Sequence, residues 1–168
     1  MSAATIELDV DPVWGQDTDW EARCAAAARA VAHVLPELAH SEILVSVVMG
    51  EDEEVHALNQ EWRAKDRPTN VLSFPMIARE ELLRAAERPG APVMLGDIIM
   101  AHGVCRREAD EKQVALADHA THLLIHGLLH LAGFDHEDGD EEAEAMEALE
   151  IRALAALGID DPYADRDI

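Results

Sequence analysis

The stretch from His122 to His136, HLLIHGLLHLAGFDH, constrains the fold of this chain more than any other segment. His126 and His130 are four residues apart, so on an α-helix they share one face, with Cβ atoms about 5–6 Å apart. That spacing allows both imidazoles to bind one metal ion. Leucine and isoleucine surround the two histidines, and Gly133 stands where a C-terminal helix cap is expected. The sequence therefore predicts a largely apolar helix that ends just before Gly133.

A third histidine follows the predicted turn. His136 comes six residues after His130, at a position that no single helix can place beside the other two. Three imidazole nitrogens with an open position are typical of a catalytic zinc site rather than a closed structural one. Core histidines hydrogen-bonded to neighbours are the alternative, but this spacing favours one Zn²⁺ per chain, bound by His126, His130 and His136. Ni²⁺, Co²⁺ or Mn²⁺ are chemically compatible with the same donors.

The residue after the first of these histidines argues against one class of zinc enzyme. The spacing H-x-x-x-H-x-x-G-x-x-H is that of the metzincin proteases, in which a glutamate follows the first histidine. That glutamate acts as the general base in the metalloproteases. Here the position is Gly127, so a peptidase is not expected.

Four stretches together resemble the YbeY family of bacterial rRNA-maturation endoribonucleases. HGLLHLAGFDH at 126–136 resembles the family signature H-G-x-L-H-L-x-G-[YF]-D-H. Three further stretches agree in the family's order: LNQEWRAKDRPTNVLSFP at 58–75, LGDIIM at 95–100 and MEALEIRALAALGI at 146–159. Asn70 is a departure, because many members carry Asp there, and it weakens any role that needs a carboxylate at this position.

The resemblance implies both a fold and an activity. The expected fold is α+β and zincin-like, with a small mixed four-stranded sheet, helices packed on it and a central metal-binding helix. The implied activity is zinc-dependent, single-strand-specific cleavage of RNA in rRNA maturation and ribosome quality control. The implied partners are rRNA precursors, proteins of the small ribosomal subunit and assembly factors; neither DNA nor a membrane is expected.

Arg63 and His126 are the predicted catalytic residues. The family pattern has a functional arginine at the position of Arg63, and a planar guanidinium suits a phosphodiester and charge developing on its oxygens. The alternative for Arg63 is a surface cation that favours a helix C-terminus. The candidates for substrate binding are Lys65, Arg67 and Ser73.

No residue stands out as the general base. Asp135 adjoins the third histidine, and His122 lies one helical turn before His126, so either residue is a candidate base or a residue that orients a ligand. Two mechanisms remain open at this point. A metal-activated water attacks the phosphorus, or the ribose 2′-hydroxyl attacks while the metal and Arg63 stabilise the charge.

Net charge argues against an RNA substrate. The chain has 35 acidic and 13 basic residues, a net charge of −22, whereas affinity for nucleic acid comes from lysine and arginine. Positive charge is concentrated in two groups, Arg63, Lys65 and Arg67 in one and Arg106, Arg107 and Lys112 in the other, the second being more typical of ordinary surface cations. The charge therefore keeps open a second hypothesis: a ribosome-assembly factor with a structural zinc that binds basic ribosomal proteins.

Length and composition predict one domain over residues 1–168, with a frayed tail from Asp160. Cys24 and Cys105 lack the spacing of a disulfide framework or a thiolate zinc site. An acidic N-terminus and the lack of an apolar run of transmembrane length predict a cytoplasmic protein.

Hydrophobic patterning predicts the remaining elements. Asp17 and Thr18 are candidate N-caps for the first helix, and residues 77–92 form a weak helix or a surface excursion. Strands are expected over residues 6–10, 42–49, 71–74 and 95–100, and helices over 19–35, 51–63, 103–117 and 141–157, besides the histidine helix.

Overall fold

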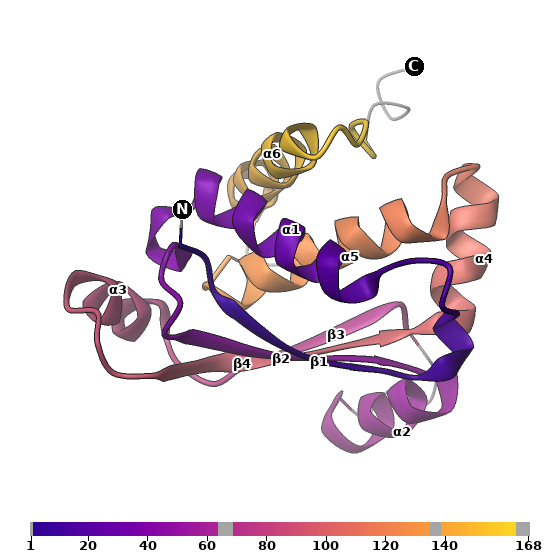
Figure 1. The fold of residues 1–168 in the computed structure, drawn as a ribbon, viewed down its shortest axis with the longest axis horizontal. Helices are drawn as coiled ribbons and strands as arrows, with labels where there is room; N and C mark the ends of the chain where they lie inside the picture. The colour runs from indigo at the N-terminus through magenta and orange to yellow at the C-terminus, as the bar shows by residue number, and fades with distance from the viewer. Residues whose placement is uncertain (1, 64–68, 135–138, 164–168) are drawn as a thin grey trace.

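The computed structural model describes residues 2–63, 69–134 and 139–163. Its backbone forms one four-stranded sheet with helices on both faces (Figure 1). The strands are β1 (Thr5–Val10), β2 (Ile43–Gly50), β3 (Val71–Pro75) and β4 (Val93–Ala101). The helices are α1 (Trp20–Val34), α2 (Asp52–Arg63), α3 (Arg79–Glu87), α4 (His102–Lys112), α5 (Leu116–Leu131) and α6 (Asp140–Ala156), with short 3₁₀ turns at η1 (Pro12–Trp14) and η2 (Pro36–Leu38).

The sheet is mixed, as predicted. Its strand order is β1-β2-β4-β3; β1, β2 and β4 run parallel, and the edge strand β3 is antiparallel to β4. Ile98 of β4 lies opposite both Val47 of β2 and Ser73 of β3. Residues directly opposite one another share a face of a sheet. Ser73 therefore lies on the same face as the buried Ile98.

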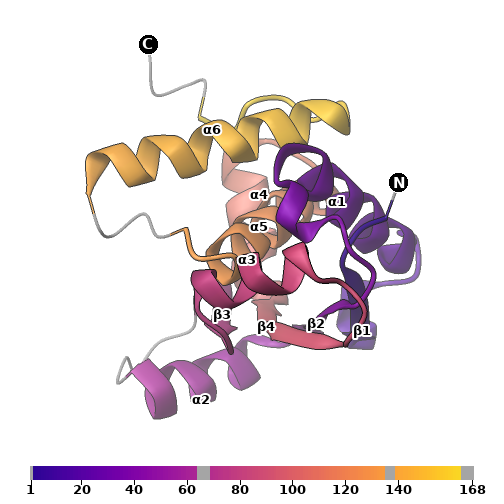
Figure 2. The same ribbon diagram turned by 90° about the vertical axis from the view of Figure 1, so that its left-hand side faces the viewer.

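The helices are divided unequally between the two faces. Helices α1 and α5 lie against one face with α6 outside them, and α2 lies on the opposite face (Figures 1 and 2). The larger core fills the space between the sheet and α1, α5 and α6. A smaller core of Val55, Leu72 and Ala101 lies under α2. Helix α5 is thus the central helix of an α+β fold, as the sequence predicted.

Most predicted elements agree with the structure, but one helix boundary was wrong. The helix expected over 103–117 ends at Lys112, and Gln113 adopts a left-handed backbone with φ 59°. Its N–H donates to the carbonyls of Ala109 and Asp110, and α5 begins at Leu116. Glycine usually occupies this left-handed position at the end of a helix, and other residues rarely do. Because the residue here is Gln113, nothing in the sequence marked the end of the helix.

Two further details of the prediction change. The N-cap of α1 is Asp19 rather than Asp17 or Thr18, because its Oδ1 accepts a hydrogen bond from the N–H of Ala22 at 3.0 Å. The segment 77–92 contains the helix α3, which is anchored by the fully buried Leu82.

Within the described ranges, no helix is both long and apolar enough to cross a bilayer.

Candidate metal centre

Helix α5 brings two histidines to the surface from an otherwise buried segment. Between His119 and Ala132 every residue is buried except His126 and His130, which are partly exposed. Their spacing places them one above the other on a single helix face. The helix therefore presents two imidazoles together where the protein meets solvent.

The His126 ring is held from behind by a buried carboxylate. Nδ1 of His126 lies 2.5 Å from Oε1 of Glu150, a residue of α6 that is 1% exposed. Burial raises the pKa of this carboxyl. Its hydrogen bonds with His122, His126 and Tyr163 outweigh that effect and bring the pKa down to about 2. Glu150 is therefore ionised at neutral pH and only accepts hydrogen bonds. His126 must then carry its proton on Nδ1, which makes Nε2 the nitrogen that would bind a metal.

Two more groups share the same carboxylate. Nε2 of the buried His122 lies 3.2 Å from Oε2 of Glu150, and the Tyr163 hydroxyl donates to that oxygen. The Tyr163 ring also packs edge-on against His122, with centroids 5.6 Å apart. Tyr163 lies in the segment from Asp160 that was predicted to be frayed, and its side chain has a buried hydrogen-bond partner.

The second histidine is held by the edge strand. Nδ1 of His130 lies 2.5 Å from the Ser73 hydroxyl of β3. If Nε2 of His130 binds a metal, Nδ1–H donates to Ser73 Oγ. Both partly exposed histidines of α5 thus have their Nδ1 atoms held by polar side chains from other elements, an arrangement typical of metal-binding histidines.

Gly127 faces the sheet rather than the solvent. A Cβ atom at this position would lie 3.0 Å from Cδ1 of Ile98 and 3.3 Å from both of its γ-carbons. Residue 127 is therefore packed against the Ile98 side chain of β4, which would have to shift to admit a glutamate here. The local packing agrees with the lack of a protease-type base.

The turn after α5 has the geometry expected at Gly133. Its φ is 105°, its N–H donates to the carbonyl of His130, and the N–H of Phe134 donates to that of Leu129. This is a Schellman cap. Arg79 secures the turn from α3: its guanidinium donates to the Ala132 carbonyl at 2.7 Å and lies 4.8 Å from the centroid of the Phe134 ring. The chain therefore leaves α5 in a fixed direction.

Several predicted site residues lie outside the described residues. They are Lys65, Arg67, Asp135 and His136, and the side chain of Arg63, whose backbone ends α2, belongs with them. Over residues 2–63, 69–134 and 139–163, no three His, Cys, Asp or Glu side chains are close enough together to hold a metal. The third ligand therefore remains a prediction.

Asn70 takes part in a separate polar network. Its Nδ2 donates to Oε1 of Glu108 at 3.0 Å, and Nε2 of the buried His119 lies 2.9 Å from the same oxygen. Burial lowers the pKa of His119, although the bond to Glu108 opposes this effect. An aspartate at position 70 would put a second carboxylate against Glu108, so the amide fits its surroundings here.

Sequence reasoning missed Glu150 and Tyr163. The signal for Glu150 was a carboxylate on the inward face of the closing helix, four residues after Met146 and three before Ala153, both buried. A charged residue in such a stripe needs a buried partner. Nothing in the local sequence marked Tyr163.

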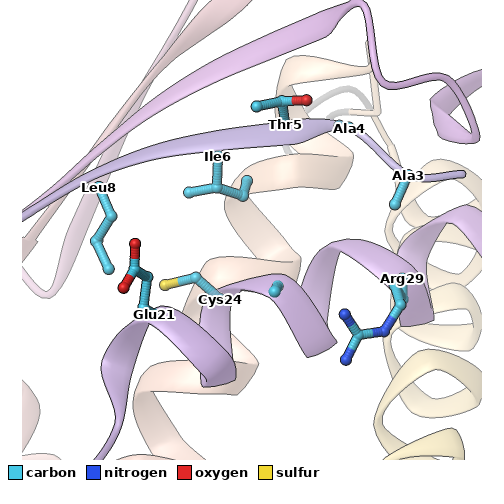
Figure 3. Close-up of a pocket in the computed structure, with 9 residues that line it drawn as sticks. Ala3, Ala4, Thr5, Ile6, Leu8, Glu21, Cys24 and Arg29 are labelled. Atoms are coloured by element: carbon cyan, nitrogen blue, oxygen red, sulfur yellow. The ribbon is translucent and has the colours of Figure 1, made fainter.

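A separate hollow lies between β1 and α1 (Figure 3). It has a volume of about 380 Å³, and Figure 3 shows Glu21 beside Cys24, with Arg29 farther along α1. The remaining labelled residues are apolar apart from Thr5. This lining brings together no set of groups suited to metal binding or catalysis.

Comparisons with known proteins agree with one another. The family model described as "Endoribonuclease YbeY" matches residues 15–158. The protein named Endoribonuclease YbeY from Novosphingobium aromaticivorans is 65% identical over 167 residues, covering 99% of this chain and 100% of the relative. Its namesake from Erythrobacter litoralis is 55% identical over 161 residues, covering 96% and 99%. The solution structure of TM1509 from Thermotoga maritima has a TM-score of 0.58 at 21% identity and 92% coverage of each chain, which shows a shared fold.

Proposed function

The chain belongs to the YbeY family of endoribonucleases, and on that premise we propose that it is a zinc-dependent, single-strand-specific endoribonuclease that acts in rRNA maturation and ribosome quality control. The proposal includes the zincin-like description of the fold, a single domain over residues 1–168 and a cytoplasmic location, where bacterial ribosomes are assembled. Its proposed partners are rRNA precursors, small-subunit proteins and assembly factors.

One observation carries the proposal. His126 and His130 are the two partly exposed residues in the buried segment from His119 to Ala132, and their Nδ1 atoms are held by Glu150 and Ser73. Each ring would thus present Nε2 on the same helix face. His136 is proposed as the third ligand of a single Zn²⁺. When bound, the metal supplies electrophilic stabilisation for charge on the phosphodiester.

Side chains of the protein are proposed to bind the RNA and to transfer the proton. Arg63 is proposed to bind the non-bridging oxygens of the scissile phosphate, with Lys65 and Arg67 holding adjacent phosphates. Ser73 is proposed to bind the RNA substrate and also to orient the His130 ring. Asp135 is the proposed base; the buried His122 instead lies against Glu150, behind the exposed histidines.

The net charge of the protein affects how RNA binds to such a site and how binding depends on salt. At −22 the protein repels RNA over long distances, so binding depends on the metal and on the cations around residues 63–67. The second basic group is partly neutralised, because Nη1 of Arg107 lies 3.7 Å from Oδ2 of Asp52. Moderate salt screens repulsion as well as attraction. Cleavage should therefore tolerate added salt better than cleavage by a basic nuclease does.

The deciding experiment measures bound metal and RNA cleavage in the same samples. Wild type, His126→Ala and His33→Ala are purified, their metal content is determined, and each is incubated with a single-stranded and a duplex rRNA fragment, with and without chelator. His33 is exposed on α1 and serves as the matched control. Circular dichroism checks that each variant is folded.

The proposal predicts about one metal per chain in wild type and His33→Ala, with cleavage of the single strand that chelator abolishes. His126→Ala should lose both metal and cleavage. Metal binding without cleavage, together with unfolding on chelation, would instead support the assembly factor with a structural zinc, which the charge of −22 favours. Cleavage by folded, metal-depleted His126→Ala would exclude a catalytic metal at this site.

A further inference from the structure

We infer that Glu150 is a positioning residue of the metal centre: it holds the His126 ring so that Nε2 faces the metal, and Tyr163 fixes the carboxylate in that orientation. The inference rests on the proposed function, because it requires His126 to be a metal ligand. It adds residues from α6 and from the segment after it to a site predicted from α5 and the turn that follows.

The Glu150 carboxylate lies inside the core of the protein. Among the described residues, Glu150 is the one acidic residue that is buried, at 1% exposure. Removing an ion from water is costly unless hydrogen bonds or an opposite charge compensate. Both of its oxygens are engaged, Oε1 by His126 and Oε2 by His122 and Tyr163. The chain thus keeps a charge inside its core whose hydrogen bonds converge on the back of the histidine helix.

The two oxygens of Glu150 have different partners. Oε2 accepts from Tyr163 and lies 3.2 Å from Nε2 of His122, which leaves Oε1 to His126. His122 does not compete for Oε1 through its other nitrogen, because its buried Nδ1 makes no hydrogen bond with the described residues. The shortest histidine contact of the carboxylate, at 2.5 Å, is therefore made to the histidine that reaches solvent.

The contact with Glu150 constrains the His126 ring. A carboxylate that accepts from Nδ1–H fixes the tautomer, limits rotation of the imidazole and increases the basicity of Nε2. Each effect strengthens metal binding at Nε2. A merely structural carboxylate would stabilise the fold without changing metal affinity, so the two roles can be separated.

Tyr163 restricts the carboxylate itself. Its hydroxyl donates to Oε2 and its ring packs edge-on against His122, so this one side chain contacts both the carboxylate and a histidine beside it. Removing only the hydroxyl should let the Glu150 carboxylate rotate and weaken its bond to His126. The effect should be smaller than that of neutralising Glu150.

The test uses the full-length protein and Co²⁺ as the probe metal. Co²⁺ affinity is measured by competition with a chromophoric chelator, and the visible Co²⁺ spectrum reports the ligand geometry. The variants are Glu150→Gln, which keeps the size of the side chain, Tyr163→Phe, and Glu144→Gln as a control that removes the same charge from an exposed position of α6. Thermal unfolding of each metal-free protein is measured in parallel.

We expect Glu150→Gln to lose about 10- to 100-fold in Co²⁺ affinity and to show an altered spectrum, the usual effect of removing a partner of a metal-binding histidine. Tyr163→Phe should show a smaller loss, and Glu144→Gln should match wild type. Wild-type affinity and spectrum in Glu150→Gln would overturn the inference, whatever its thermal stability, and would leave the proposed zinc site intact. Failure of the wild type itself to bind Co²⁺ would overturn the proposed function first, and the inference with it.

Discussion

The hydroxyl of Ser73 lies 2.5 Å from Nδ1 of His130, so the edge strand β3 contacts the histidine helix at one of its two partly exposed histidines. Ser73→Ala removes this contact without adding bulk. We expect Co²⁺ affinity to fall about 10-fold, at the low end for partners of metal-binding histidines, with little change in stability. Ser73→Thr keeps a hydroxyl and should retain more affinity. If Ser73→Ala raised only the KM for RNA, the residue would act through the substrate instead.

Gly127→Glu would restore the glutamate found in metalloproteases. We expect no peptidase activity and a loss of stability above about 3 kcal/mol. The side chain would meet Ile98 at 3.0 Å, and overpacking costs about 1–3 kcal/mol before a buried, unpaired carboxylate is added. Gly127→Ala is the control: better helix propensity offsets a tight contact with a flexible side chain, so the change should stay within about 1 kcal/mol. Urea denaturation measures both, and a stable, proteolytic Gly127→Glu protein would contradict the prediction.

Gly133→Ala tests the turn that follows the histidine helix. Gly133 has φ 105°, and a Cβ there would lie 2.8 Å from Cβ of Arg79. We expect a loss of about 1–3 kcal/mol in stability from backbone strain, together with weaker Co²⁺ binding because the chain leaves α5 in a new direction.

Gly158 offers a matched control for that change. It also has a positive φ, of 75°, but a Cβ there would meet nothing within 4 Å. Gly158→Ala should cost about 1–2 kcal/mol and leave Co²⁺ affinity unchanged. Equal metal affinities in the two variants would show that the turn at Gly133 does not help to build the site.

The two cysteines should be inert in the folded protein. Burial, reinforced by Glu21, raises the pKa of Cys24 to about 12, and burial with Glu108 and Asp52 does the same for Cys105. The thiolate is the reactive form, so neither residue should react with a thiol reagent at pH 8 until denaturant is added. Because both pKa values are raised by folding, this contribution to stability is present at neutral pH and is lost as the pH rises above about 9. Rapid labelling of the native protein would contradict the burial of these thiols.

Sequence patterns identified helix α5, its two exposed histidines and its glycine cap, because these features are local. Spacing along one helix decides which histidines share a face, and one glycine decides where the helix ends. The contact between Glu150 and His126 is different in kind, since it depends on how α6 packs across α5. The α4–α5 boundary was missed for another reason, because Gln113 adopts a conformation that glycine usually provides. The helix, its partly exposed histidines and its cap were thus predictable, whereas the residues that contact those histidines from other elements were not.

The hydrogen bonds around Glu150 also join parts of the chain that are made at different times. Translation produces His126 first, then Glu150 and finally Tyr163. A nascent chain therefore cannot complete this set of contacts until Tyr163 has left the ribosomal exit tunnel. Under the proposed function, the histidine that would bind the metal is fully supported only after residues far downstream of it have been made and have folded against it.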